Sequence, residues 1–323
     1  MKGVKGTIMD NNAIYLSPAL KECIWGGTKL KTKYNKKSDI ERLGESWELS
    51  THKDGASTVK GGIYDGLTLN EYIEKNEGCL GANAEKFEYF PILIKFIDAL
   101  DNLSIQVHPD DAYAMKVEGE YGKTEMWYIL EADEGAYIYY GVNRKITKDE
   151  FKARIKDNTV LEVLNKVPVK KGDVFFIKSG TIHAIGKGIV ICEIQQNSNT
   201  TYRVYDYDRR DKNGNPRELH IDKAIDVSTL EPAPKAEIKD INSADCTLAE
   251  CGYFTVRKLN PSNGINIKIT DKCFHSLIVT DGNGLLTING QELVLTKGDS
   301  VFIPAQNGEY SINGKCDVIL SYV

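Results

Sequence analysis

The chain of 323 residues is long enough for roughly two domains. Its 41% hydrophobic and 27% charged residues are ordinary for a soluble globular protein and exclude a disordered chain. The formal net charge of −5 predicts no general attraction to nucleic acid or to an anionic membrane. The seven cysteines form no Cys-x-x-Cys pair, which favours a reducing, cytoplasmic compartment over a disulfide framework or a thiolate zinc site. Residues 1–12 lack an apolar segment, so we expect no signal peptide, and no stretch is apolar enough to span a membrane.

Helices are predicted at three places in the first two thirds of the chain. Thr68 and Glu71 have the spacing of a capping box, and Thr147 and Glu150 repeat it at the start of a helical insertion near 147–165. Residues 110–118 predict a further short helix that ends at Gly119.

The remaining predicted elements are strands, because Val, Ile and Tyr recur between Gly and Asn turn residues. In chain order, they are 104–108, a strand–turn–strand over 126–141, 189–194, and a hairpin of 276–280 and 285–289 that turns at the Asp-Gly-Asn-Gly segment 281–284.

One short motif occurs twice. Gly172-Asp-Val-Phe-Phe-Ile177 recurs 126 residues later as Gly298-Asp-Ser-Val-Phe-Ile303, and a strand–turn–strand precedes each copy. We interpret this as two related β-units, with the 147–165 helix inserted in the first; a chance recurrence is the alternative. The Pro-containing segment 231–235 is the predicted linker, which divides the chain into 1–232 and 233–323.

Four side chains of the first unit form a candidate metal site. Alternation along a strand places Gln106 and His108 on one face. Glu125 begins a strand seventeen residues later, and His183 follows a glycine turn. Two imidazoles, a carboxylate and an amide oxygen suit zinc or another borderline divalent ion, although Gln is an uncommon ligand.

Other interpretations of these residues exist. A lone buried histidine is more often a hydrogen-bonded core residue, and we assign His52, His220 and His275 to that class. Glu125, taken alone, fits a solvated carboxylate at the start of a strand. The second copy of the repeat has neither a counterpart of His183 nor a Gln-x-His pair like that of Gln106 and His108, which indicates that only the first unit is catalytic.

Longer motifs extend the comparison to known families. Gly172 through His183 resembles the second cupin motif, with Lys178 where Pro is usual. Four further segments together resemble the short bacterial form of type I mannose-6-phosphate isomerase: Ile24-Trp-Gly-Gly27, Phe96-Ile-Asp-Ala-Leu-Asp-Asn-Leu-Ser-Ile-Gln-Val-His-Pro109, the Lys123-x-Glu125 pair, and Gly180-Thr-Ile-His-Ala184. The match covers roughly residues 12–210.

This resemblance implies a mainly β fold with two cupin-like β-barrel (jelly-roll) units and short helical insertions. It implies one Zn²⁺ per chain, held by Gln106, His108, Glu125 and His183. It further implies a catalytic role for Arg203 and substrate binding by Lys95 and Lys123. Longer members of the family carry an acidic residue where this chain has Asn199, so a role of that carboxylate in proton transfer does not carry over.

The implied reaction interconverts mannose 6-phosphate and fructose 6-phosphate in the cytoplasm through an enediol(ate), in a monomer or weak homo-oligomer. Cationic side chains would stabilise the developing negative charge and bind the phosphate. Three candidates for the catalytic base follow from the sequence: a metal-bound water, a deprotonated lysine, or a further group that the motifs do not single out. A sugar-phosphate-binding cupin without turnover is the alternative, and an iron cupin oxygenase is disfavoured because Gln106 replaces the first histidine of the usual His-x-His.

Overall fold

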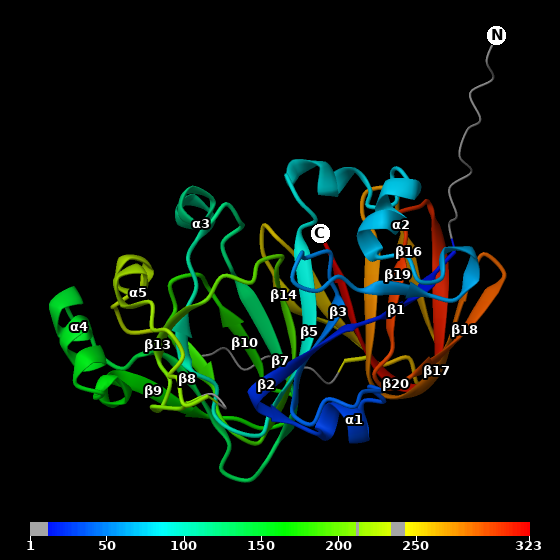
Figure 1. Ribbon diagram of the computed structural model, residues 1–323. Helices are drawn as coiled ribbons and strands as arrows, with labels where there is room; N and C mark the ends of the chain where they lie inside the picture. The colour runs from blue at the N-terminus through cyan, green and yellow to red at the C-terminus, as the bar shows by residue number, and fades with distance from the viewer. Residues whose placement is uncertain (1–11, 211–212, 234–242) are drawn as a thin grey trace.

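The computed structural model describes residues 12–210, 213–233 and 243–323. The prediction of a mainly β fold is confirmed, because twenty strands form three sheets in which each pairing between strands is antiparallel, while the helices are short. Figure 1 shows two of the sheets in the first two thirds of the chain and the third sheet at the C-terminal end. The predicted linker is described only as far as residue 233, and 234–235 lie outside the described residues.

The first two sheets face each other. The six-stranded sheet has the order β10-β7-β12-β5-β2-β3, and the five-stranded sheet has the order β13-β6-β11-β8-β9. The strands of the six-stranded sheet are β2 (Ala19–Gly27), β3 (Leu43–Leu49), β5 (Ile92–Ala99), β7 (Glu125–Ala132), β10 (Val174–Ile177) and β12 (Ile189–Gln196). The strands of the five-stranded sheet are β6 (Ile105–Val107), β8 (Tyr137–Val142), β9 (Leu164–Pro168), β11 (His183–Ile185) and β13 (Tyr202–Tyr205).

Alternation along the strands separates the two faces of the six-stranded sheet. On β12, Ile189 and Ile191 pack between the two facing sheets, whereas Val190, Cys192 and Ile194 pack on the opposite side. All of these side chains are buried, so both faces of this sheet are covered. A polar residue at an odd-numbered position of β12 therefore lies in the space between the two facing sheets.

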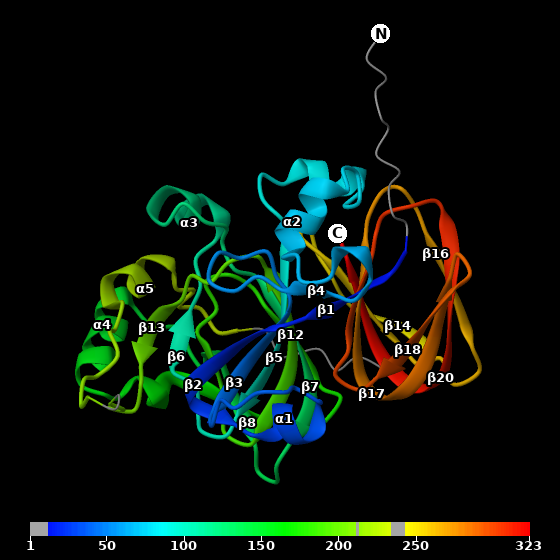
Figure 2. The ribbon, with the colours of Figure 1, turned by 45° about the vertical axis from the view of Figure 1, so that its right-hand side comes forward.

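The nine-stranded sheet belongs mostly to the C-terminal part of the chain, but β1 and β4 from the N-terminal part extend it. Figure 2 shows β1 crossing from the first two sheets to this third one. A shared apolar cluster joins this sheet to the six-stranded one. The strands are β1 (Ile14–Ser17), β4 (Thr58–Lys60), β14 (Asp245–Glu250), β15 (Thr255–Leu259), β16 (Ile265–Ile269), β17 (His275–Ile288), β18 (Gln291–Thr296), β19 (Ser300–Ile303) and β20 (Gly308–Tyr322).

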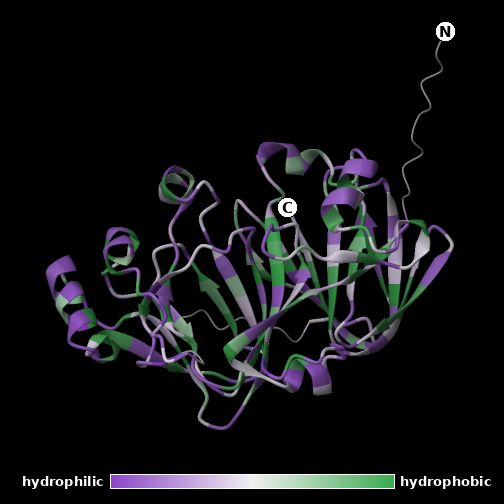
Figure 3. Cartoon of the chain, in the orientation of Figure 1, coloured by the Kyte–Doolittle hydropathy of each residue, from purple (hydrophilic) through white to green (hydrophobic). Residues whose placement is uncertain are grey.

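The three predicted helices are confirmed. Thr68 and Glu71 form a complete capping box, and the side chain of Thr147 accepts a hydrogen bond from the backbone of Glu150. Helices α4 and α5 pack on the outer face of the five-stranded sheet, and Figure 3 shows the hydrophilic residues that α4 exposes. The α-helices are α1 (Lys29–Lys33), α2 (Leu69–Lys75), α3 (Asp111–Val117), α4 (Lys148–Lys156) and α5 (Ile221–Val227). Three 3₁₀ segments cover Gly62–Tyr64, Ala82–Lys86 and Val160–Val163. Among the described residues, no helix is long and apolar enough to cross a membrane.

The two copies of the Gly-Asp motif form the same turn. Gly172 and Gly298 both have φ of 93°. The Asp173 carboxylate accepts a hydrogen bond from the backbone N–H three residues earlier at 2.9 Å, and Asp299 accepts the equivalent bond at 2.8 Å. Each turn leads into a strand, β10 or β19. The sequence repeat therefore corresponds to a repeat of structure.

The predicted hairpin turn at 281–284 is wrong. Strand β17 continues through this segment, and its pairing with β20 shifts between Val279 and Asp281, which marks a β-bulge. Gly282 has φ of 69° and permits the bulge. The chain turns instead at Asn289 and Gly290, whose φ angles of 49° and 78° are those of a two-residue hairpin turn.

Candidate active site

Three buried side chains bring potential metal ligands together between the first two sheets. His108 follows β6, Glu125 begins β7 and His183 begins β11. One ligand atom from each lies within 4.8 Å of the others. The His108 Nε2 atom is 3.1 Å from Glu125 Oε1, and the His183 Nε2 atom is 3.7 Å from Glu125 Oε2. Three elements distant in sequence thus converge on one carboxylate.

Backbone carbonyls determine which nitrogen of each imidazole faces the carboxylate. His108 Nδ1 is 2.9 Å from the Thr200 carbonyl, and His183 Nδ1 is 2.8 Å from the Thr181 carbonyl. Because a carbonyl only accepts, each Nδ1 carries a proton, and in the neutral ring Nε2 has a lone pair. Burial lowers the pKa of His108 to about 3 and also lowers that of His183, so both rings are neutral at pH 7.

Two lone pairs therefore point at an ionised carboxylate. Burial acts to raise the pKa of Glu125, but the charge of Lys123 and the contact with His108 outweigh it and hold the pKa well below its ordinary value. An arrangement in which hydrogen-bond acceptors face one another with no proton between them is unfavourable. A bound cation would interact favourably with both Nε2 lone pairs and with the carboxylate. Ring nitrogens oriented by carbonyls are also typical of metal-binding histidines. The donor set fits a divalent metal.

Gln106 lies beside this set. Strand β6 places it opposite His183 in the register of β6 and β11, and its Nε2 atom is 3.4 Å from His183 Nε2. The oxygen and nitrogen of a side-chain amide exchange places by rotation, so the amide oxygen can face the same point. All four predicted ligand residues are therefore neighbours.

A polar cavity of about 280 Å³ adjoins the metal-ligand candidates. All three cationic residues selected from the sequence, Lys95, Lys123 and Arg203, line it. Lys123 Nζ is 2.8 Å from Glu125 Oε1. Burial acts to lower the pKa of Lys123, but the charges of Glu125 and Glu193 outweigh it and raise the pKa in the metal-free protein. The other lining residues are Trp25, Glu45, Ile97, Leu103, Ser104, Gln106, Ile185, Glu193, Asn199, Thr201 and Arg217.

Glu193 is the most informative residue that the sequence reasoning missed. It lies on β12, and its Oε1 atom accepts a hydrogen bond of 2.8 Å from Trp127 Nε1, which also lies 3.0 Å from Glu125 Oε2. Burial, and then the charge of Glu125, raises the pKa of Glu193 to about 7. Its position on the same strand face as Ile189 and Ile191 was visible in the sequence as a charged residue within an apolar alternation.

Arg203 lines the cavity from the five-stranded sheet, whereas Glu193 belongs to the six-stranded one. Arg203 lies on β13 directly across from Gln106 of β6. Its Nη1 atom donates to the Glu218 carbonyl at 2.8 Å, and its buried Nε atom has no hydrogen-bond partner among the described residues. Burial, and then the charge of Arg217, lowers the pKa of Arg203. A second arginine beside a buried, incompletely paired guanidinium indicates a site for an anion.

The prediction that His52, His220 and His275 are hydrogen-bonded core residues is confirmed for two of them. His52 and His275 are buried, and their Nδ1 atoms pair with the Asp54 backbone N–H and the Tyr310 hydroxyl. The prediction is wrong for His220, whose side chain is 26% exposed before α5 and accepts a hydrogen bond from the Arg203 backbone.

Comparison with known proteins decides the family. The model of the type I phosphomannose isomerase catalytic domain matches residues 14–138, and that of the mannose-6-phosphate isomerase cupin domain matches residues 244–323. Mannose-6-phosphate isomerase of Streptococcus mutans is 40% identical over 312 residues, which cover 96% of this chain and 98% of the relative. The chain belongs to the type I mannose-6-phosphate isomerases. The family resemblance and the cupin fold class predicted from the sequence are thereby confirmed.

Further members of the family match almost the whole chain in sequence or in structure. Mannose-6-phosphate isomerase ManA of Bacillus subtilis is 40% identical over 322 residues, with 98% of this chain and 100% of the relative covered. The crystal structure of the mannose 6-phosphate isomerase from Bacillus subtilis superimposes with a TM-score of 0.86 at 38% identity, over 96% of this chain and 99% of that one. A putative mannosephosphate isomerase from Archaeoglobus fulgidus gives a TM-score of 0.80 at 25% identity, with 98% and 99% covered.

Asn199 connects two loops at the wall of the cavity. Asn199 lines the cavity, and its amide nitrogen donates a hydrogen bond of 2.9 Å to the Asp54 carboxylate. An amide has no proton to exchange at neutral pH. Asn199 therefore links two loops, and its side chain cannot itself act as a base.

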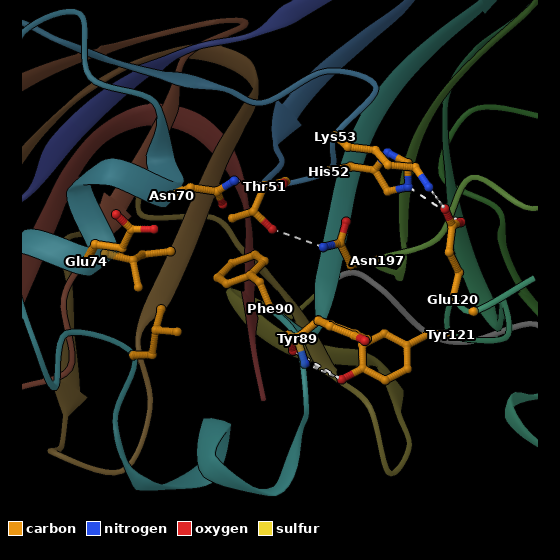
Figure 4. Close-up of a pocket in the computed structure, with 13 residues that line it drawn as sticks. Thr51, His52, Lys53, Asn70, Glu74, Tyr89, Phe90, Glu120, Tyr121 and Asn197 are labelled. Carbon is orange, nitrogen blue, oxygen red and sulfur yellow. Dashed lines mark hydrogen bonds and ion pairs between the residues drawn. The ribbon is translucent and has the colours of Figure 1, made fainter. Parts of the chain in front are cut away.

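A larger cavity of about 500 Å³ shares no lining residue with the polar one (Figure 4). Lys53 and His52 lie 2.7 Å and 3.6 Å from the Glu120 carboxylate at its wall. Glu120 also accepts a hydrogen bond of 3.4 Å from the Thr200 hydroxyl, and the Thr200 carbonyl orients His108. This second cavity contains none of the metal-ligand candidates, so the chemistry favours the smaller one.

Proposed function

We propose that this protein interconverts mannose 6-phosphate and fructose 6-phosphate. The observation that carries the proposal is that a buried His-Glu-His cluster adjoins one cavity that also holds Glu193, Lys123 and Arg203. The names of the relatives that match over nearly their full length support the same reaction. This isomerisation moves a proton between C2 and C1, which requires a base near both carbons and stabilisation of an enediolate.

We further propose that Gln106, His108, Glu125 and His183 hold one Zn²⁺ per chain. Nitrogen and oxygen donors in this number suit zinc, and both imidazoles present an Nε2 lone pair to the same carboxylate. When bound, the metal supplies Lewis-acid polarisation of the substrate oxygens.

The side chains of the cavity supply the remaining chemistry. Glu193 takes the proton from C2 of the aldose and returns it to C1, because burial raises the pKa of this carboxyl and so favours a group that can both accept and return a proton. Arg203 is the catalytic cation that stabilises the negative charge of the enediolate. Lys95 and Lys123 bind the substrate from the six-stranded sheet and the loop before β7, with Lys123 remaining protonated.

Three broader statements accompany this function. We propose a cytoplasmic location, supported by seven cysteines that are all free. We propose a monomer or weak homo-oligomer, with a sugar phosphate as its small-molecule partner and neither nucleic acid nor membrane. We also retain the division into a metal-binding unit, 1–232, and a C-terminal unit without metal ligands, 233–323, while noting that β1 and β4 pair within the C-terminal sheet.

A coupled isomerase assay tests the proposal against the binding protein without turnover. Purified protein should convert mannose 6-phosphate at roughly 1–10³ s⁻¹, lose the activity with a chelator and regain it when Zn²⁺ is added back. Binding of mannose 6-phosphate in calorimetry, with no turnover at any metal loading, would establish the binding protein instead.

A further inference from the structure

Two clusters of charge divide the polar cavity. The strongest charge effects on the pKa of Glu193 come from Glu125, Lys123, Lys95 and Glu45. Those on the pKa of Arg203 come from a different set, in the segment that follows β13, namely Arg217, Asp206, Arg209 and Glu218. The cavity therefore has a carboxylate-rich end and an arginine-rich end.

The arginine-rich end is built around one buried carboxylate. Asp206, 5% exposed, accepts two hydrogen bonds from Arg217, at 2.7 Å from Nε and 2.6 Å from Nη2, and a further one from Arg209. A guanidinium held at two points by one carboxylate has little rotational freedom. Arg217 lines the cavity, whereas Asp206 and Arg209 do not. Asp206 is therefore a positioning residue for Arg217.

The arginine-rich end keeps unpaired positive charge, whereas the two lysines at the other end are already paired with carboxylates, Lys95 with Glu45 at 3.5 Å and Lys123 with Glu125 at 2.8 Å. Three arginines share the single buried carboxylate of Asp206 at one end, and the carboxylate of Glu218 is 81% exposed and therefore screened by water. At the other end, Lys95 and Lys123 face the carboxylates of Glu45, Glu125 and Glu193. A phosphate monoester carries a charge of about −1.5 to −2 at pH 7. Its favourable position is the arginine-rich end.

We propose that Arg217, positioned by Asp206, binds the phosphate group of the substrate and so determines specificity for phosphorylated sugars. This assignment rests on the proposed function. It also determines the orientation of the bound sugar phosphate in the cavity. The phosphate lies at the arginine-rich end, and C1 and C2 lie beside Glu193 and Lys123. Arg203 is the member of the arginine-rich end that neighbours Gln106 in the register of β13 and β6, so it is the arginine nearest in the sheet to the metal-ligand candidates.

The test compares Arg217→Ala, Arg217→Lys and the control Arg210→Ala in metal-loaded protein. Arg210 is an exposed arginine of the same segment that does not line the cavity. The measurements are kcat and KM for mannose 6-phosphate, and the Kd of inorganic phosphate by calorimetry. Loss of a hydrogen-bonded charge pair in Arg217→Ala should raise both KM and the phosphate Kd by about 10- to 100-fold. The kcat should stay within about threefold, because the phosphate is bound equally in ground and transition states.

The two controls make the result decisive. Arg217→Lys keeps the charge but loses the planar fork, so its KM should rise by about 3- to 10-fold, and Arg210→Ala should match the wild type. An unchanged KM and phosphate Kd in Arg217→Ala would overturn the proposal, as would a fall in kcat at constant KM. If Arg217→Ala does not fold, a wild-type KM in Arg217→Lys overturns it. Absence of turnover in the wild type would refute the isomerase instead, and the phosphate Kd would still test Arg217.

Discussion

Replacement of Glu193 by Gln tests the catalytic carboxyl most directly. The change removes the titratable group and keeps an amide oxygen that can accept the hydrogen bond from Trp127. Burial and the neighbouring charge of Glu125 raise the pKa of Glu193 from 4.5 to about 7. That rise means that the ionised form costs the folded protein about 3 kcal/mol relative to the unfolded chain.

The sign of the pH dependence follows from this shift. Below the unfolded pKa, Glu193 is protonated in both states and has no effect on the free energy of unfolding. As the pH rises through 4.5 toward 7, the unfolded chain ionises first and the folded protein loses stability, and the full penalty is present above about 7. The Gln variant escapes this penalty, so its advantage over the wild type grows with pH.

Denaturant unfolding of chelator-treated protein at about pH 5 and about pH 8.5 measures this difference, which should increase by about 2–3 kcal/mol in favour of Glu193→Gln. Glu45→Gln is the matched control in the same cavity. Burial acts to raise the pKa of Glu45, but the charge of Lys95 and the hydrogen bond from Trp47 outweigh it and lower the pKa. Glu45 is therefore ionised in the folded protein and mostly ionised in the unfolded chain over this pH range, so the stability difference between Glu45→Gln and the wild type should stay nearly constant.

Turnover gives the second measurement. In metal-loaded Glu193→Gln, kcat for mannose 6-phosphate should fall by roughly 10²–10⁴, the usual contribution of a general acid–base group, while metal content stays constant. A stability difference that does not change with pH would refute the buried, raised-pKa state of Glu193. A kcat within threefold of the wild type would refute its role in proton transfer.

Three further predictions concern the metal set and the cavity wall. His108→Ala and His183→Ala should each abolish most retention of the single metal ion, measured by elemental analysis, and retention of a full equivalent in either variant would contradict the ligand assignment. Arg203→Ala should keep the metal and the circular dichroism spectrum but lower kcat by roughly 10²–10³; a raised KM alone would mark Arg203 as a phosphate-binding residue instead. Asn199→Asp places a carboxylate against the Asp54 carboxylate that now accepts its hydrogen bond, so thermal unfolding at pH 7 should show lower stability while kcat falls less than about tenfold. A large gain in kcat would show that position 199 needs a carboxylate.

Local features of the fold could be predicted because their energies depend on residues close in sequence. The capping box of Thr68 and Glu71 and the repeated Gly-Asp turns each form hydrogen bonds over about three residues, and the structure confirms them. The hairpin in 276–289 was misplaced for the same reason. Both the 281–284 segment and Asn289-Gly290 satisfy the local requirements of a turn, and only pairing with β20 distinguishes them.

Prediction of the site was limited in the same way, because part of it depends on contacts between residues distant in sequence. Residue types and motifs were sufficient to select Gln106, His108, Glu125 and His183, since metal chemistry restricts the ligands to a few side chains. The sequence could not determine the ring orientation of His108, because Thr200 and His108 are 92 residues apart. The roles of Glu193 and Arg217 became evident only in the folded chain, because they depend on burial, on a shared cavity and on charges from other segments. Those quantities arise from packing between distant segments, which the order of residues along the chain does not display.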